Sequence, residues 1–130
     1  LTQWCSYVIE VNGKRVYFGG DSGYGKHFKE IGDAYGPFEL TMLECGQYNK
    51  NWADIHMDPS ETSLAHSDLK GKKLLPLHWG KFKLSLHEWT EPMDVLFANA
   101  NKVSDQIITP EIGAVLDIND STQSDFWWKK

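Results

Sequence analysis

The chain has 130 residues, which is enough for one domain, or part of one, with a modest hydrophobic core. Its composition, 41% hydrophobic and 24% charged, is typical of a globular protein, and no apolar stretch reaches the roughly 20 residues that a membrane helix needs. A net charge of −5 argues against nucleic acid or an anionic membrane as a partner, because both are bound by clustered lysine and arginine.

The cysteine content bears on the cellular compartment. Cys5 and Cys45 are too few for a disulfide scaffold, and they do not form a zinc-binding pair. One bridge between them is compatible with the sequence. The low count fits a reducing compartment, and we therefore expect a cytoplasmic protein.

The first predicted element is a β-hairpin made of residues 4–11 and 14–20. The two β-rich runs are separated by Asn12-Gly13, the dipeptide most typical of a tight hairpin, because both turn positions tolerate a positive φ. The chain begins with Leu1 rather than methionine, and a strand-like run has already started at Trp4. We therefore expect the sequence to be a fragment of a longer polypeptide.

The middle of the chain alternates between helix and strand. Residues 25–36 are predicted to form a short helix with one apolar face, ending at Gly36-Pro37. A largely apolar strand over residues 38–45 follows. The next segment, residues 46–57, is a polar loop that carries a histidine and several aromatic residues, which is more typical of a functional loop than of a plain connection.

The predicted second helix starts at Asp58, which begins a capping box, and ends near Lys70. Further elements are a buried strand, a third helix and two short strands, over residues 72–79, 91–102, 106–110 and 114–118. This order predicts an α/β fold with helices on one face of the sheet. Residues 119–130 form a tail in which Phe126-Trp127-Trp128 are candidates for docking.

Three strand ends carry residues able to do chemistry. Asp21 follows the second strand, Glu44 ends the third and His78 follows the fourth, while His56 immediately precedes a helix. Ligands of open α/β sheets gather at the carboxyl ends of the strands, so these side chains are expected at one edge. Aspartate and histidine together are typical ligands of zinc.

Each of these residues also has a purely structural interpretation. An aspartate after two glycines is often part of a turn, and a histidine that ends an apolar strand is often a hydrogen-bonded core residue. Glu44 is either a buried functional acid or the partner of Lys50 or Lys81. The other three histidines are expected to face solvent: His27, His66 and His87.

The combination of motifs is more specific than any single residue. "GGDSGYG" at residues 19–25, "HMDP" at 56–59 and "LPLHWGKF" at 75–82 resemble the carboxyl half of the metallo-β-lactamase superfamily. The resemblance is greatest to the branch typified by N-acyl-phosphatidylethanolamine-hydrolysing phospholipase D. It extends over residues 4–118, so that we expect 1–118 to be the carboxyl half of such a domain and 119–130 to be a tail.

This resemblance implies roles for five residues. Asp21 would bridge two divalent metal ions, zinc in the relatives, and His78 would be the last histidine ligand. His56 would act in catalysis by orienting the substrate or protonating its leaving group, with Tyr24 and Trp79 of the same motifs near the substrate. The implied activity is hydrolysis of a small-molecule substrate, phosphodiesterase-like or lactonase-like, by a metal-bound hydroxide.

The residue chemistry agrees with this assignment. A carboxylate has two oxygens and can bind two cations at once, and the glycines around Asp21 allow a close approach of the backbone. Two metals about 3.5–4 Å apart lower the pKa of a shared water and stabilise the oxygens of a displacement.

The superfamily's principal ligand motif, His-x-His-x-Asp-His, does not occur in the 130 residues. Asp21 and His78 leave a tetrahedral zinc two ligands short, so the chain alone is expected to be inactive. The implied fold is a four-layer αββα sandwich of two halves, and a lone half exposes an apolar sheet face. We expect that face to bind either the missing amino half or a second copy.

The sequence is compatible with two alternatives. The chain could be a non-catalytic α/β interaction module in which Asp21 and His78 are structural. It could also form a mononuclear site from Asp21, His56 and His78 when zinc is abundant.

Overall fold

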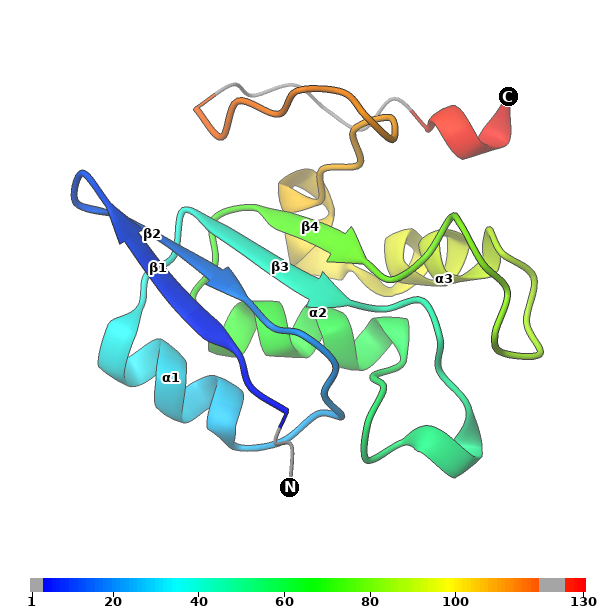
Figure 1. Ribbon diagram of the computed structural model, residues 1–130, viewed down its shortest axis with the longest axis horizontal. Coiled ribbons are helices and arrows are strands. Elements are labelled where there is room, and N and C mark those ends of the chain that lie inside the picture. The colour runs from blue at the N-terminus through cyan, green and yellow to red at the C-terminus, as the bar shows by residue number, and fades with distance from the viewer. Residues whose placement is uncertain (1–3, 120–125) are drawn as a thin grey trace.

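The structure, a computed structural model, describes residues 4–119 and 126–130 (Figure 1). Its centre is one mixed sheet in the order β1-β2-β3-β4, in which β1 is antiparallel to β2, and β2, β3 and β4 are parallel. The strands are β1 Tyr7–Val11, β2 Lys14–Phe18, β3 Leu40–Glu44 and β4 Leu74–Leu77. The predicted hairpin is confirmed, and both Asn12 and Gly13 have a positive φ.

In the described part of the chain, three α-helices accompany the sheet. In Figure 1, α1 and α2 lie side by side beneath the sheet, while α3 packs against α2. Their bounds are α1 His27–Tyr35, α2 Pro59–Asp68 and α3 Glu91–Asn99, and three short 3-10 helices are η1 Lys50–Trp52, η2 Asn101–Gln106 and η3 Trp127–Lys129. No helix in the described part of the chain has both the length and the hydropathy to cross a membrane.

The capping box predicted at the start of α2 is present. The Asp58 side chain accepts hydrogen bonds from the backbone N–H groups of Ser60 and Glu61, and the Glu61 carboxylate accepts one from the Asp58 backbone. These bonds satisfy N–H groups that have no partner inside the helix, so α2 begins at a defined residue directly after His56 and Met57.

The hydrophobic core lies between the sheet and the helices. Tyr17 of β2 projects toward α1, where its ring packs against Phe28 at 6.4 Å and against Phe38 at 5.6 Å between ring centroids. Leu43 and Leu74, from the two central strands, are completely buried in the same core. Alternate residues of each strand thus face the helices.

The opposite face of the sheet is apolar and partly open. Phe18, next to the inward-facing Tyr17, points to this second face, and its register partner in β1 is Tyr7. Ile9 and Val11 follow on the same side of β1, and all four side chains are exposed. The hairpin therefore presents a contiguous apolar surface away from the helices.

The two strands predicted after α3 are not formed. Residues 101–106 form the 3-10 helix η2. Beside β4 lies an isolated bridge between Leu74 and Ile107, with a hydrogen bond from Ile108 N–H to Leu74 O, and residues 107–110 form no strand. Pro110 has no N–H to continue this ladder. The 114–118 segment is a loop that pairs with no strand of the described residues, and its Val115 is 97% exposed.

The aromatic residues near the carboxyl end dock on the domain itself. Trp128 is buried against Trp79 and Phe97, at 5.3 and 5.9 Å between ring centroids. Residues 120–125 of the predicted tail lie outside the described part.

The expectation that His66 faces solvent is wrong. It lies on the inward side of α2 and is completely buried; Thr41 Oγ1 is 2.7 Å from its Nδ1, and Gln106 Oε1 is 2.7 Å from its Nε2. Burial lowers its pKa, so the ring is a neutral connection between β3, α2 and η2. His27 and His87 are half-buried.

Candidate metal centre

The three residues expected to act together converge at one edge of the sheet. Asp21 follows β2, His78 follows β4, and His56 lies in the loop between β3 and α2. Each offers one donor atom, and these three atoms all lie within 4.8 Å of one another. His78 Nε2 is 3.9 Å from Asp21 Oδ1, and the rings of His56 and His78 are 5.2 Å apart.

The parallel strands explain this convergence, because their carboxyl ends meet at the same edge of the sheet. His78 has a φ of +65°, which turns the chain sharply out of β4. Gly46, after β3, packs directly on this turn: a Cβ atom at Gly46 would lie 1.8 Å from His78 O. A side chain at Gly46 would therefore displace His78.

The glycines around Asp21 bring two loops together. A Cβ atom at Gly23 would lie 2.2 Å from Ala53 O, and Gly23 N–H donates to Asp54 O. Gly20 has a φ of +63° and lies against Cys5 O. These glycines pack the loop of Asp21 on its neighbours, which places the short aspartate side chain opposite the two histidines.

Glu44 lies behind His56, inside the protein. Its Oε1 accepts the Met57 N–H, and its Oε2 lies 3.5 Å from His56 Nδ1. Burial raises the pKa of Glu44 to about 8, and burial lowers the pKa of His56 below its usual value. The pair is therefore largely a neutral acid beside a neutral imidazole at pH 7. The alternative pairing of Glu44 with Lys50 or Lys81 is not the one observed.

The two aromatic residues predicted to contact the substrate make other contacts. The Tyr24 hydroxyl donates to Asp68 Oδ2 at 2.6 Å, a bond that raises the pKa of Tyr24 to about 12. Trp79 donates from Nε1 to Pro76 O and stacks on Trp127. These contacts fix both side chains in the fold, and their role toward a substrate stays a prediction.

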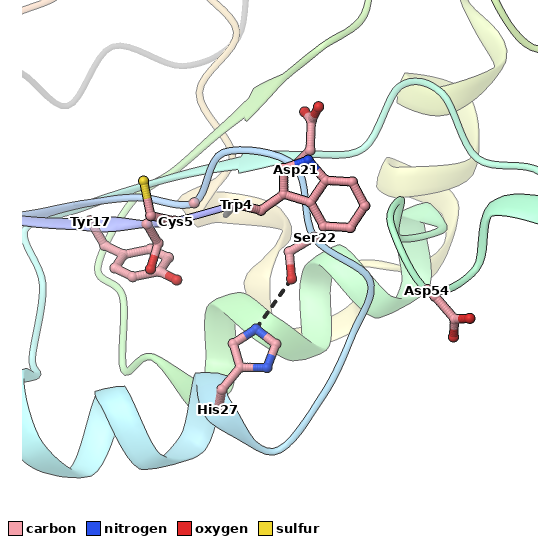
Figure 2. A pocket seen from close by; sticks show the side chains of 9 residues that line it. Trp4, Cys5, Tyr17, Asp21, Ser22, His27 and Asp54 are labelled. Carbon is pink, nitrogen blue, oxygen red and sulfur yellow. Dashed lines mark hydrogen bonds between the residues drawn. The ribbon is translucent and has the colours of Figure 1, made fainter. Parts of the chain in front are cut away.

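A cavity of about 160 Å³ opens on another side of Asp21 (Figure 2). Ser22 points into it, with Oγ 3.3 Å from His27 Nε2, while the Asp21 carboxylate points the opposite way. No motif in the sequence indicates this pair, since the contact depends on the turn into α1. The cavity is lined by Trp4, Cys5, Ser6, Tyr17, Gly19, Asp21, Ser22, His27 and Asp54.

The donor set fits a divalent metal of the zinc type. A carboxylate and an imidazole suit zinc, and Asp21 and His78 are both exposed, so that an ion can reach them from solvent. Of the His, Cys, Asp and Glu side chains that the structure describes, this is the group that converges in this way.

Comparisons with known structures first define the class of fold. An isothiocyanate hydrolase from Delia radicum gut bacteria superimposes with a TM-score of 0.65 at 21% sequence identity, over 85% of this chain and 43% of that chain. A metallo-β-lactamase fold protein of Bacillus subtilis superimposes with a TM-score of 0.57 at 20% identity, over 78% of this chain and 39% of the other. The fold is α/β with a mixed sheet, as in the metallo-β-lactamase proteins.

Sequence comparison then shows the family. Residues 1–79 match the beta-lactamase superfamily domain, and the chain belongs to this family of metallo-β-lactamase-fold, metal-dependent hydrolases. The resemblance seen in the three motifs is thereby confirmed.

Two curated relatives illustrate the similarity and its extent. An uncharacterized protein of Mycobacterium tuberculosis is 40% identical over 131 residues, which cover 98% of this chain and 35% of the relative. The mitochondrial N-acyl-phosphatidylethanolamine-hydrolyzing phospholipase D of Saccharomyces cerevisiae is 34% identical over 117 residues, 85% of this chain and 25% of the enzyme. The chain thus spans about a third or less of the length of these relatives.

Proposed function

We propose that this chain is the carboxyl-terminal part of a metal-dependent hydrolase that is phosphodiesterase-like or lactonase-like. The enzyme would have a site for two divalent metal ions, and the carboxylate and imidazole donors favour zinc. Asp21 and His78 would be its metal ligands from this part. The observation that carries the proposal is the convergence of the Asp21, His56 and His78 donor atoms within 4.8 Å. The family supports the hydrolase class, and the motif "HMDP" supports a catalytic role for His56.

The metal ligands and His56 would have different roles in this reaction. Metal ions held there would activate water and polarise the scissile group of the substrate. Asp21 would bind both ions with its two oxygens, because a carboxylate can do so and a neutral imidazole cannot. His56, neutral at pH 7, would donate a proton or a hydrogen bond to the leaving group.

We also propose that the 130 residues alone are inactive. Two ligands are not enough for a tetrahedral zinc, so the other ligands would come from further sequence of the longer protein. The apolar face of β1 and β2 would be covered by that amino-terminal part, which would pack as a second sheet. The length of the relatives, of which this chain spans 35% or less in the two cases above, supports this arrangement.

The test is metal analysis of a longer polypeptide that extends this chain at its amino end. We expect Asp21→Ala and His78→Ala each to lower the bound metal and to reduce hydrolysis of phosphodiester or lactone model substrates by at least 100-fold. The matched control is Asp54→Ala, which removes a carboxylate beside the neighbouring cavity. Unchanged metal content in Asp21→Ala would refute the bridging role.

A further inference from the structure

The buried pair of Glu44 and His56 contains two polar atoms without a partner. Among the described residues, Glu44 Oε2 and His56 Nδ1 are both inaccessible to solvent and make no hydrogen bond. They lie 3.5 Å apart, which is longer than a hydrogen bond but is closed by a small rotation of the ring. Leaving both buried atoms unpaired would destabilise the fold, so a hydrogen bond between them lowers the free energy of the folded chain.

Glu44 is held firmly enough to act as an anchor. Thr62 Oγ1 of α2 donates to Glu44 O at 3.0 Å, and Met57 N–H donates to Glu44 Oε1. Because Oε1 is occupied, Oε2 is the oxygen that faces the imidazole. The side chain is only 2% exposed, so no solvent competes for this contact.

His56 is fixed from its other sides as well. Its backbone N–H donates to Trp52 O at 2.8 Å, and the two rings pack edge-on at 6.1 Å between centroids. The ring of His78 lies 5.2 Å away on the side of the metal centre. With Nδ1 directed at Glu44, Nε2 is the nitrogen left for the centre.

We propose that Glu44 is a positioning residue: as a carboxylic acid it donates from Oε2 to His56 Nδ1 and thereby places the ring proton on Nε2, facing Asp21 and His78. The raised pKa of Glu44 supports this protonation state at pH 7. A ring that carries its proton on Nε2 is a hydrogen-bond donor toward the site and not a metal ligand. A role for the His56 Nε2–H group in hydrolysis rests on the proposed function, whereas the hydrogen bond between Glu44 and His56 does not.

The test is nitrogen-15 NMR of the histidine rings in the metal-free 130-residue chain at pH 7. We expect His56 in the wild type to be a single tautomer with the proton on Nε2. Glu44→Gln should keep this pattern, because its amide can accept from Met57 N–H and donate to Nδ1. Glu44→Met, which preserves the volume without a donor, should produce a mixture of tautomers.

The matched control is Glu61→Gln, which changes a nearby carboxylate that bonds to the Asp58 backbone and should leave the His56 signals unchanged. A wild-type ring with its proton on Nδ1 would overturn the proposal, even if Glu44→Met failed to fold. So would a folded Glu44→Met with unchanged His56 shifts. Since no metal or substrate is used, failure here is distinguishable from failure of the hydrolase proposal.

Discussion

His56 lies between two contrasting environments. On one side are Asp21 and His78, both exposed, where ligands can be exchanged with solvent. On the other side is Glu44, buried and uncharged at neutral pH, where a hydrogen bond faces no competition from water. The same imidazole can therefore be held rigidly through one nitrogen and remain available through the other.

The buried Glu44 carboxyl makes a prediction about stability. Its pKa is about 8 in the folded chain and near 4.5 when unfolded, so the unfolded state loses its proton first as the pH rises. The free energy of unfolding should therefore fall between pH 4.5 and 8, by up to about 1.4 kcal/mol per pH unit from this group. The free energy of unfolding of the Glu44→Gln variant should change less with pH than that of the wild type.

Urea denaturation at pH 6.5 and pH 8 measures this difference. Burial lowers the pKa of His56 and His66, whose ordinary value is 6.5, so near pH 6.5 these rings are partly protonated only in the unfolded chain and make the free energy of unfolding rise with pH. This opposing contribution is the same in wild type and Glu44→Gln, so the difference between the two pH profiles isolates Glu44. Parallel pH profiles of wild type and Glu44→Gln would show that Glu44 ionises normally in the folded protein.

At the scale of the elements, the site depends on how the ends of β3 and β4 pack. Residues of parallel strands reach one edge together, and the turn at His78 is possible because Gly46 leaves room for its carbonyl group. The Gln47 side chain continues this packing: its amide donates to Phe82 O and accepts from the N–H groups of Leu84 and Ser85. The loop after His78 is thereby tied to the end of β3.

Gly46→Ala tests this packing. The added methyl group would overlap His78 O, so we expect a loss of stability of at least about 2 kcal/mol and, in the longer polypeptide, weaker zinc binding. Urea denaturation and metal analysis provide the two measurements. Gly113→Ala is the control: its φ of +93° is strained for alanine, unlike the backbone at Gly46, but nothing lies within 4 Å of the added atom. Equal effects of the two substitutions would contradict the overlap as the cause.

At the scale of the whole molecule, the two faces of the sheet differ. The helices cover one face, whereas Tyr7, Ile9, Val11 and Phe18 of the hairpin are exposed on the other. Contiguous apolar surface of this kind promotes association in water. A partner, either the proposed amino-terminal part or a second copy, would remove it from solvent.

We expect the isolated 130-residue chain to self-associate through this face as its concentration rises. Ile9→Lys puts a charge in the centre of this apolar face. In sedimentation-velocity experiments, this variant should contain more monomer than the wild type at the same concentration. Leu64→Lys is the matched control, because Leu64 is similarly exposed, at 48% against 45% for Ile9, but lies on α2 away from the patch. A wild type that stays monomeric at millimolar concentration would contradict this expectation.

The sequence alone determined the features that depend on neighbouring residues or on a specific motif. Asn12-Gly13 defined the hairpin, and Asp58 defined the start of α2, since turns and caps are built from residues close in the chain. The positions of Asp21 and His78 after predicted parallel strands also indicated that they lie at one edge. The carboxyl ends of parallel strands lie at the same edge of a sheet, whatever the order of the strands.

Only the tertiary structure decided the contacts between distant segments. The run at residues 114–118 has the composition of a strand but pairs with no strand in the part of the chain that the structure describes. His66 has the polarity of a surface residue but is completely buried, with Thr41 and Gln106 at its two ring nitrogens. Glu44 lies beside His56 because the loop folds back before α2. Strand pairing and burial are properties of the packed molecule, and a linear pattern does not contain the partner that creates them.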